Sequence, residues 1–280
     1  MAQRSTGITL LNRIVLISSV ILCYVLMLAP IAAVIWLSFF KSDIIAVPPP
    51  GYSFHAYRAL LGFGDFLSGL RLSVVVAVAA TAISLVLGTL AAIAIVRGNF
   101  LGRALLGTFF LAPLTVPAIV LGLAIYIFLF QAGAAIGIRI VGNIASLVLG
   151  HVVLTLPWTI RFTSVGLATI DRNLEEAAMD LGARPIRTFF HITLPLMRSS
   201  LFAAAIFAFL ASYNALEISI FLVAPGLTTV PIVLLQRIAW NFDPMVAAMA
   251  TVQVAISAVA LVLLTRIIGV ERIFATQGQS

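Results

Sequence analysis

Long apolar runs separated by short polar intervals organise this chain. About twenty apolar residues are enough for a helix to cross the hydrocarbon core of a bilayer. The pattern predicts six membrane-spanning helices, at residues 14–40, 72–96, 104–130, 143–160, 201–224 and 244–265. The expected fold class is an all-α polytopic membrane protein with both ends on one side of the membrane.

The first apolar run has two readings. Arg4 and Arg13 precede it, and small residues at 28–33 within it could form a cleavage site, as in a secretory signal peptide. The run is 27 residues long, however, whereas the apolar core of a signal peptide has about 7–15 residues. We therefore expect an uncleaved first span after a cytoplasmic N-terminus, residues 1–13.

The polar intervals predict the loops. Residues 41–71 should form an external loop with a short interfacial helix around 55–61, and residues 131–142 and 225–243 should form two more external loops. Residues 97–103 form a short basic turn. Pro113 and Pro117 should kink the third span, because proline lacks the N–H that a helix uses. A GxxxG spacing at Gly133 and Gly137 falls in a predicted loop.

Composition and charge support the membrane assignment. The chain is 62% hydrophobic and 9% charged, against about a quarter charged in soluble domains. Its net charge of +7 comes without any Lys/Arg run, so nucleic acid is not an expected partner. Eleven basic residues fall in the predicted inner segments and five in the outer ones. The positive-inside rule then places both termini, including the tail 269–280, and the loop 166–198 in the cytoplasm.

The loop 166–198 is the longest polar interval. Asn173 or Asp171 can cap a helix, with Glu176 completing a capping box after Asn173. Gly182 suits the left-handed residue that ends a helix. A second short helix is expected from Pro185 to His191, before Leu194-Pro195 stop it and return the chain to the membrane.

This loop carries a motif. Glu176-Ala177-Ala178, three residues, Gly182, nine residues, Ile192, one residue and Leu194-Pro195 match the EAA signature. The chain resembles, over roughly residues 70–268, the permease subunits of type I ABC importers, which gives an expected permease core at 72–268. Residues 174–196, 231–233 and 243–248 resemble the spermidine/putrescine-type branch.

The resemblance implies a transport function and a set of partners. The EAA helix would couple to an ATP-hydrolysing subunit through Glu176, Ala177, Ala178 and Gly182, while Ile192, Leu194 and Pro195 would hold the exit of the loop. The implied assembly contains a second, non-identical permease, two ATP-binding subunits and an extracytoplasmic solute-binding protein in a bacterial inner membrane. The alternative is a loop helix that lies on lipid headgroups.

The chain lacks the residues for chemistry of its own. Its one lysine, Lys41, follows Phe40 and belongs to no Gly-Lys-Ser/Thr loop, so we expect ATP and Mg²⁺ on the partner and no cofactor or metal here. An embedded enzyme would need Ser, His or Asp side chains that face one another, and His151 is the only His or Asp in spans two to four. We expect His151 to be hydrogen-bonded structurally, with a role in the transport path as the alternative. A membrane scaffold is the remaining rival.

One acidic residue lies well inside a predicted span. On a continuous helix Glu217 would lie roughly 10 Å below the outer boundary, where a carboxylate usually faces water or a partner. Tyr213 and Asn214 would share its helical face. We expect these residues to line a path for a small cation such as a polyamine. The alternatives are a protonated, structural Glu217, and as cargo ferric iron, an aminophosphonate or another small organic solute.

Overall fold

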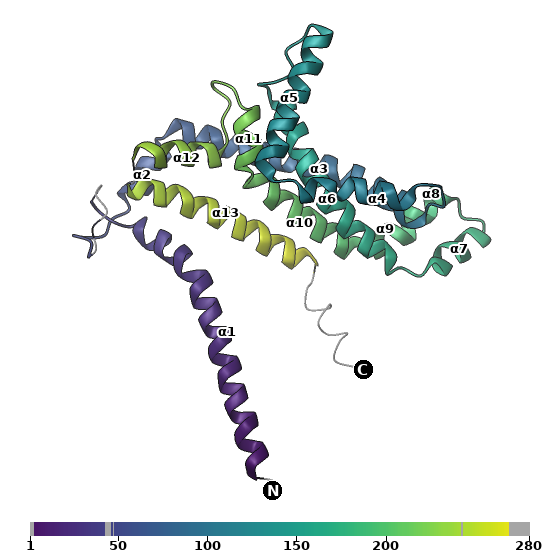
Figure 1. The fold of residues 1–280 in the computed structure, drawn as a ribbon, viewed down its shortest axis with the longest axis horizontal. Helices are drawn as coiled ribbons and strands as arrows, with labels where there is room; N and C mark the ends of the chain where they lie inside the picture. Colours follow the sequence, from purple (N-terminus) through teal and green to yellow (C-terminus); the bar gives the residue numbers. More distant parts are fainter. Residues whose placement is uncertain (1–2, 43–45, 47, 242, 269–280) are drawn as a thin grey trace. The chain divides into compact units, whose positions relative to one another are not determined.

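The computed structural model describes residues 3–42, 46, 48–241 and 243–268, so the predicted tail 269–280 lies outside the described residues. Secondary structure in this part of the chain is helical apart from two isolated bridges, Phe40 with Tyr52 and Ala224 with Leu227. The helices (Figure 1) are α1 Gln3–Leu37, α2 His55–Leu61, α3 Gly64–Arg97, α4 Arg103–Leu111, the 3-10 helix η1 Ala112–Thr115, α5 Ala118–Ile136, α6 Ile144–Ala168, α7 Arg172–Asp180, α8 Pro185–Thr188, the π-helix η2 Phe189–Thr193, α9 Leu194–Leu196, α10 Arg198–Tyr213, α11 Leu216–Leu222, α12 Val230–Trp240 and α13 Pro244–Ile268.

Several helices are long and apolar enough to cross a membrane. Five described segments meet that requirement: 12–37, 64–97, 118–136, 144–168 and 244–263. The bent pair 185–196 and 198–213 makes a sixth if it is counted as one span, with 71° between its halves. The prediction of an all-α polytopic membrane protein is confirmed.

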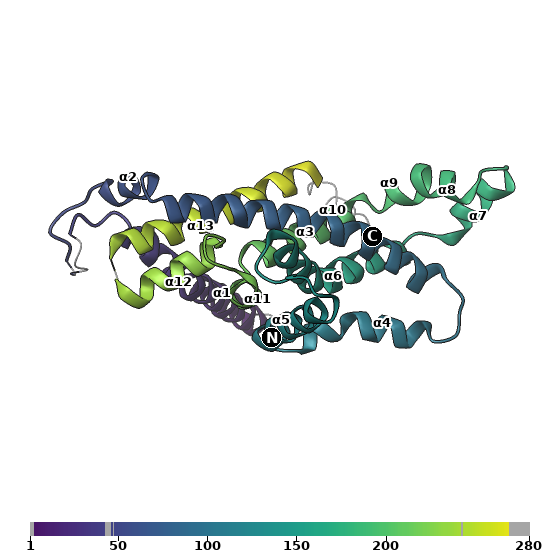
Figure 2. The same ribbon diagram turned by 90° about the horizontal axis from the view of Figure 1, so that it is seen from above.

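The chain divides into two compact units. The larger contains Gly64–Leu235 and the described residues from Ala255 onward, and in it α3, α6 and α10 lie side by side (Figure 2). Hydroxyl groups join α3 to α6: Ser84 Oγ lies 2.6 Å from Thr155 Oγ1, and Thr159 Oγ1 donates to the Ser84 carbonyl at 2.9 Å. Small and polar residues at helix contacts are typical of membrane bundles, where lipid removes the hydrophobic drive for association.

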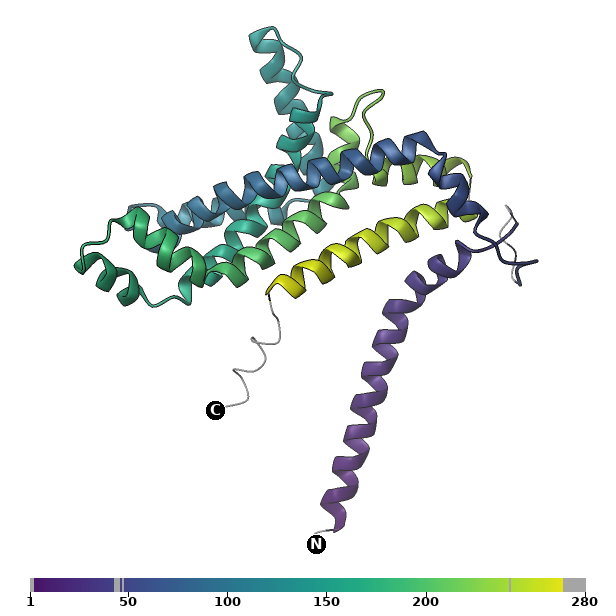
Figure 3. The same ribbon diagram turned by 180° about the vertical axis from the view of Figure 1, so that it is seen from behind.

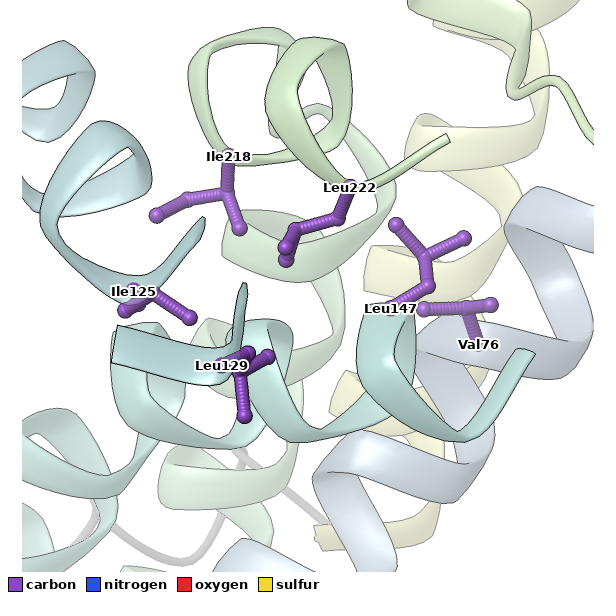
Figure 4. Packing of buried hydrophobic residues seen from close by; sticks show 6 residues of the cluster. All are labelled: Val76, Ile125, Leu129, Leu147, Ile218 and Leu222. Carbon is purple, nitrogen blue, oxygen red and sulfur yellow. The ribbon is translucent and has the colours of Figure 1, made fainter. Parts of the chain in front are cut away.

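An apolar cluster joins the short helix α11 to this bundle. Figure 4 shows six buried side chains in contact, contributed by α3 (Val76), α5 (Ile125 and Leu129), α6 (Leu147) and α11 (Ile218 and Leu222). Because α11 has only seven residues, it could not hold its position by its own hydrogen bonds. Its burial between α5 and α6 fixes it.

The smaller unit contains Met1–Phe63 and Gln236–Val254. The side chains of α1 are exposed from residue 12 to residue 33, an apolar surface that suits lipid. After α1, the bridge between Phe40 and Tyr52 and a 2.7 Å hydrogen bond between the Ser38 and Tyr57 hydroxyls close the loop. The short helix predicted at 55–61 is confirmed as α2.

The third predicted span is not one continuous helix. The chain leaves the α-helix after Leu111, passes through η1 and begins α5 only at Ala118. Pro113 and Pro117 both remove a backbone donor, so they break the helix instead of only bending it. The helix α5 then continues to Ile136 through residues predicted as loop, with Gly133 buried inside it. Figure 3 shows α5 running across the direction of α3.

Three other boundaries differ from the prediction. Helix α1 begins at Gln3, so most of the predicted N-terminal segment 1–13 is helical. Helix α3 begins at Gly64, eight residues before the predicted start at Leu72, with Asp65 in its first turn where the helix dipole favours a negative charge. Helix α12 lies in the predicted loop 225–243. The three segments contain polar residues, so the hydropathy pattern predicts loops there, but the ends of helices accept such residues.

Candidate functional site

The loop with the EAA spacing begins with helix α7. Asp171 is the residue that caps it: its Oδ1 accepts a hydrogen bond from the Asn173 N–H at 3.0 Å. The helix therefore starts at Arg172, and the capping box predicted from Asn173 to Glu176 is wrong. Of the two predicted caps, Asp171 is correct, because an N-cap must lie outside the helix that it caps.

Gly182 is the left-handed residue that terminates α7, as predicted, two positions after its last helical residue, Asp180. The backbone of Gly182 is left-handed, with φ of +92°. Its N–H donates to the Met179 carbonyl at 2.9 Å, and the Ala183 N–H donates to the Ala178 carbonyl at 3.0 Å. These two bonds make a Schellman motif, which fixes the direction in which the chain leaves the helix.

The second half of the loop differs from the prediction. Pro185 begins a helix as expected, but the chain stays helical through η2 and α9, and Leu194-Pro195 do not stop it. Pro195 has no N–H for the preceding turn, and the wider turn of the π-helix before it accommodates this loss. The 71° bend comes at the buried Met197, between α9 and α10.

The signature residues are spread over this helical hairpin. Glu176 is half exposed and pairs with Arg172 of its own helix, Nε to Oε1 at 2.9 Å. Ala177 is exposed and Ala178 partly buried beside it, while Gly182 lies exposed at the turn. In the returning segment Ile192 and Leu194 are partly buried and Pro195 is exposed.

An ion pair that was not predicted from the sequence anchors this hairpin. Glu175 Oε2 lies 3.0 Å from Nε of Arg97, the last residue of α3. Thr193 Oγ1 donates to Glu175 Oε1 at 2.7 Å, and Arg97 Nη2 donates to the Ile170 carbonyl at 3.0 Å. The EAA spacing contains Glu176, whereas the neighbouring Glu175, outside that spacing, points inward. Arg97 at the end of an apolar run was the available signal.

Apolar side chains remain uncovered around α7 and α8. Leu181 is 89% exposed and Ile186 73% exposed. Leu174, Met179 and Phe190 are also exposed. We name this set, Leu174, Met179, Leu181, Ile186 and Phe190, the loop apolar surface. All five lie between residues 174 and 190, and a group of exposed apolar side chains that lies together can mark a site where a protein meets a partner or a membrane.

The predicted path residues do not share one helical face. Helix α10 ends at Tyr213, and α11 begins only at Leu216, after Asn214 and the extended Ala215. Tyr213 is buried, whereas Asn214 and Glu217 are exposed. The prediction of a continuous helix is wrong here, so the depth of Glu217 can no longer be derived from it. Glu217 lies in the first turn of α11.

His151 forms hydrogen bonds to the helices on both sides of this break. Its Nδ1 lies 2.7 Å from Ser212 Oγ of α10, and its Nε2 lies 3.1 Å from Ser219 Oγ of α11. Ser219 Oγ donates to the Ala215 carbonyl, so it can accept from Nε2–H, and Ser212 then donates to Nδ1. The expected structural hydrogen bonding of His151 is confirmed.

Helix α5 approaches the same break closely. A Cβ on Gly122 would lie 2.6 Å from the Glu217 carbonyl oxygen and 3.2 Å from the Ile218 Cα. Only glycine allows α5 to approach the backbone of α11 at this distance. The position of Glu217 thus depends on α5 and on α6.

The described residues contain no group of three or more His, Cys, Asp or Glu side chains that could hold a metal ion. The loop that contains α7, α8, η2 and α9 lies at one end of the α3, α6 and α10 bundle (Figure 2), and the break between α10 and α11 lies along the bundle.

Comparison with known proteins decides the family. Residues 84–270 match the family described as "Binding-protein-dependent transport system inner membrane component". The chain belongs to this family. The match includes the EAA loop and the break at Asn214, and the predicted type I ABC importer permease of the spermidine/putrescine-type branch is confirmed.

Relatives and a solved structure agree with this family. The chain is 32% identical over 232 residues to the putrescine transport system permease protein PotI of Escherichia coli K12, covering 82% of each chain. It is 24% identical to the spermidine/putrescine permease protein PotC of the same strain, covering 80% of this chain and 82% of PotC. A bacterial ABC transporter involved in the import of alginate shares the fold, with a TM-score of 0.65, 16% identity and coverage of 92% and 96%. This binding-protein-dependent permease is a multi-pass inner-membrane protein.

Proposed function

We propose that this permease couples to an ATP-hydrolysing subunit through α7 and forms half of a path for a small organic cation. The observation that carries the coupling proposal is the loop apolar surface, which no described part of the chain covers. Exposed Leu181 and Ile186 flank a helix whose small residues, Ala177 and Ala178, permit close approach of a partner.

The construction of the loop supports docking of a rigid helix. Asp171 caps α7, Gly182 ends it, and the ion pair between Arg97 and Glu175 anchors its inner side. A fixed helix loses little conformational freedom on binding. In the proposal Glu176, Ala177, Ala178 and Gly182 contact the partner. Ile192, Leu194 and Pro195 shape the returning segment.

The proposal includes an assembly and an orientation. A second, non-identical permease completes the path, two ATP-binding subunits carry ATP and Mg²⁺, and an extracytoplasmic solute-binding protein delivers cargo. The excess of Lys and Arg in the segments on the side of the loop supports cytoplasmic N- and C-termini.

Co-purification tests the coupling proposal. The tagged chain is expressed with its neighbouring genes, extracted in mild detergent and compared with Glu176→Arg and Gly182→Leu. Asp65→Arg, the same charge reversal in the exposed first turn of α3, is the matched control. We expect a P-loop ATPase with the wild type and the control, and its loss from both loop variants. A well-folded wild type that retains no ATPase would contradict the proposal and favour a scaffold or a headgroup-bound loop.

We propose a polyamine as the cargo. Glu217 is exposed next to the exposed Asn214, and within the described residues its carboxylate has no ion pair or hydrogen bond. A carboxylate in a membrane-spanning region is costly unless it faces water or a cation. The relative PotI, named for putrescine transport, supports a cationic cargo. Tyr213 is buried and stacks on Phe209, so in the proposal it holds the end of α10 in place and does not line the path itself.

Uptake by the assembled complex tests the cargo. Labelled putrescine, 2-aminoethylphosphonate and ferric iron are offered separately to the wild type, Glu217→Gln and Glu217→Asp. We expect putrescine uptake whose half-saturating concentration rises about tenfold in Glu217→Gln, because one charge-assisted contact is lost. Glu217→Asp should keep most of the affinity. Equal putrescine uptake by the wild type and Glu217→Gln would contradict the role of Glu217, and uptake of another cargo alone would replace the polyamine.

A further inference from the structure

Four residues form a junction at the cytoplasmic-loop end of the larger unit. Arg97 ends α3, Ile170 follows α6, Glu175 lies in α7 and Thr193 ends η2. We name Arg97, Ile170, Glu175 and Thr193 the Arg97 junction. Its members come from segments far apart in the sequence, and Figures 1 and 2 show these segments meeting at one end of the bundle.

Each charged member holds two partners at once. Arg97 places Nε 3.0 Å from Glu175 Oε2 and Nη2 3.0 Å from the Ile170 carbonyl. Glu175 uses its second oxygen to accept from Thr193 Oγ1 at 2.7 Å. Arg97 Nη2 donates a hydrogen bond to Ile170 while its Nε forms an ion pair with Glu175, so moving α7 away from α3 separates the two charges.

Burial distinguishes this junction from an ordinary surface ion pair. The side chains of Arg97 and Glu175 are 20% and 14% exposed, against 65% and 50% for Arg172 and Glu176 on the same loop. Exposed pairs contribute little because water screens them, whereas breaking a largely buried pair leaves an uncompensated charge. Arg97–Glu175 joins two helices far apart in the sequence, whereas Arg172–Glu176 lies within one helix and Arg237 and Asp243 are six residues apart.

The junction also lies on the route from α7 into the membrane. Glu175 precedes Glu176 on α7, Arg97 closes the 34-residue helix α3, and Thr193 lies next to the segment that bends into α10. A displacement of α7 therefore acts on α3 through the Arg97–Glu175 ion pair and on the segment before α10 through the Thr193–Glu175 hydrogen bond.

We propose that the Arg97 junction transmits movement of α7 to α3 and α10, with Arg97, Glu175 and Thr193 as positioning residues. The inference rests on the proposed coupling of α7 to an ATPase. Glu176 and its neighbours hold the partner, and the Arg97 junction converts the movement of that partner into movement of the membrane helices. Loss of the junction should uncouple hydrolysis from transport without releasing the ATPase.

The test uses the reconstituted complex with putrescine as cargo and measures ATP hydrolysed per solute transported. Arg97→Gln and Glu175→Gln remove one charge each. We expect both to retain the ATPase and to raise the ratio at least about fivefold, the lower range of coupling between sites. The double variant should be no worse than either single one, because both remove the same link.

Milder variants keep the test valid where a charge variant fails to fold. Thr193→Val removes the donating hydroxyl at nearly constant volume, and Thr193→Ser restores it. We expect a raised ratio for the first and a wild-type ratio for the second. Asp243→Asn is the matched control: it removes the charge from another part-buried pair, Arg237–Asp243 at 2.7 Å, while its amide oxygen can still cap α13 at Val246.

The outcomes separate this inference from the proposed function. Unchanged ratios in Arg97→Gln, Glu175→Gln and Thr193→Val would overturn it, as would loss of the ATPase from these variants, because the junction would then serve docking. A raised ratio in Asp243→Asn equal to that in Glu175→Gln would also overturn it. Failure of the wild type to bind any ATPase would instead contradict the proposed coupling itself.

Discussion

At the scale of single residues, Gly182 sets the direction in which the chain leaves α7. Its φ of +92° is a conformation that residues with a Cβ adopt only at a cost. No atom of the neighbouring structure lies within 4 Å of a Cβ built there, so the restriction is in the backbone and not in packing. A substitution at this position therefore disturbs no packing within the chain and acts through the backbone turn and the proposed contact with the partner.

Substitutions at Gly182 should form a graded series. Asn tolerates the left-handed region, whereas Val does not, and the expected cost of the left-handed conformation is about 1–2 kcal/mol. We expect ATPase retention in the order Gly182, Gly182→Asn, Gly182→Val, measured by co-purification at equal expression. Because the site is open, equal retention by all three would show that the turn does not position the coupling surface.

At the scale of elements, the broken fifth span is the feature that places Glu217. His151 bonds to Ser212 before the break and to Ser219 after it, and α11 is packed against α5 at Gly122. The short helix thus owes its position to three other helices. Its geometry is a property of the bundle and cannot be read from its own seven residues.

Filling the contact at Gly122 should move α11. In Gly122→Leu the new side chain meets the Glu217 carbonyl and the Ile218 Cα, which are backbone atoms and cannot rotate away. We expect at least about a tenfold loss of putrescine affinity, with unfolding free energy lowered by about 1–3 kcal/mol as for overpacking.

Gly107→Ala is the control for this prediction. A Cβ at Gly107 meets only Ile95 Cγ2, at an ordinary 3.7 Å, so this helix position accepts alanine. Substrate titration of both variants checks the prediction. Wild-type affinity in Gly122→Leu would mean that the placement of α11 is not required for cargo binding.

The elements also show what could be predicted from the sequence. Apolar length predicts the spans, and residue chemistry at helix ends predicts α2, the Asp171 cap and Gly182. The breaks at residues 112–117 and 214–215 were missed because apolar composition continues across them. The pairing of Arg97 with Glu175 was missed because it depends on how α3 and α7 meet in space. The roles of the site residues stay predictions.

At the scale of the whole molecule, the chain exposes more apolar surface than a soluble protein would. The side chains of helix α1 are exposed along residues 12–33. The loop apolar surface is also exposed, and it lies in the polar segment between the predicted fourth and fifth spans. Lipid suits the first surface, and a protein partner suits the second. The two surfaces should therefore lie in different environments.

Labelling from one side of the membrane tests the orientation. Cys23 is the only cysteine, so Cys23→Ala gives a background for single-cysteine variants. Leu181→Cys and Trp240→Cys place a thiol at side chains that are 89% and 86% exposed. We expect a membrane-impermeant maleimide to label Trp240→Cys in intact spheroplasts and Leu181→Cys only after permeabilisation. The reverse pattern would show that the loop is external.

The most direct test of the coupling claim is cross-linking from α7 in the assembled complex. Ala177→Cys in the Cys23→Ala background places one thiol on the exposed side of that helix. With a maleimide that carries a photoactivated cross-linking group, the account predicts one major product that joins this chain to the P-loop ATPase and disappears in Gly182→Val. A product that joins only two copies of this chain, or no protein product in a complex that still hydrolyses ATP, would contradict the coupling role of α7.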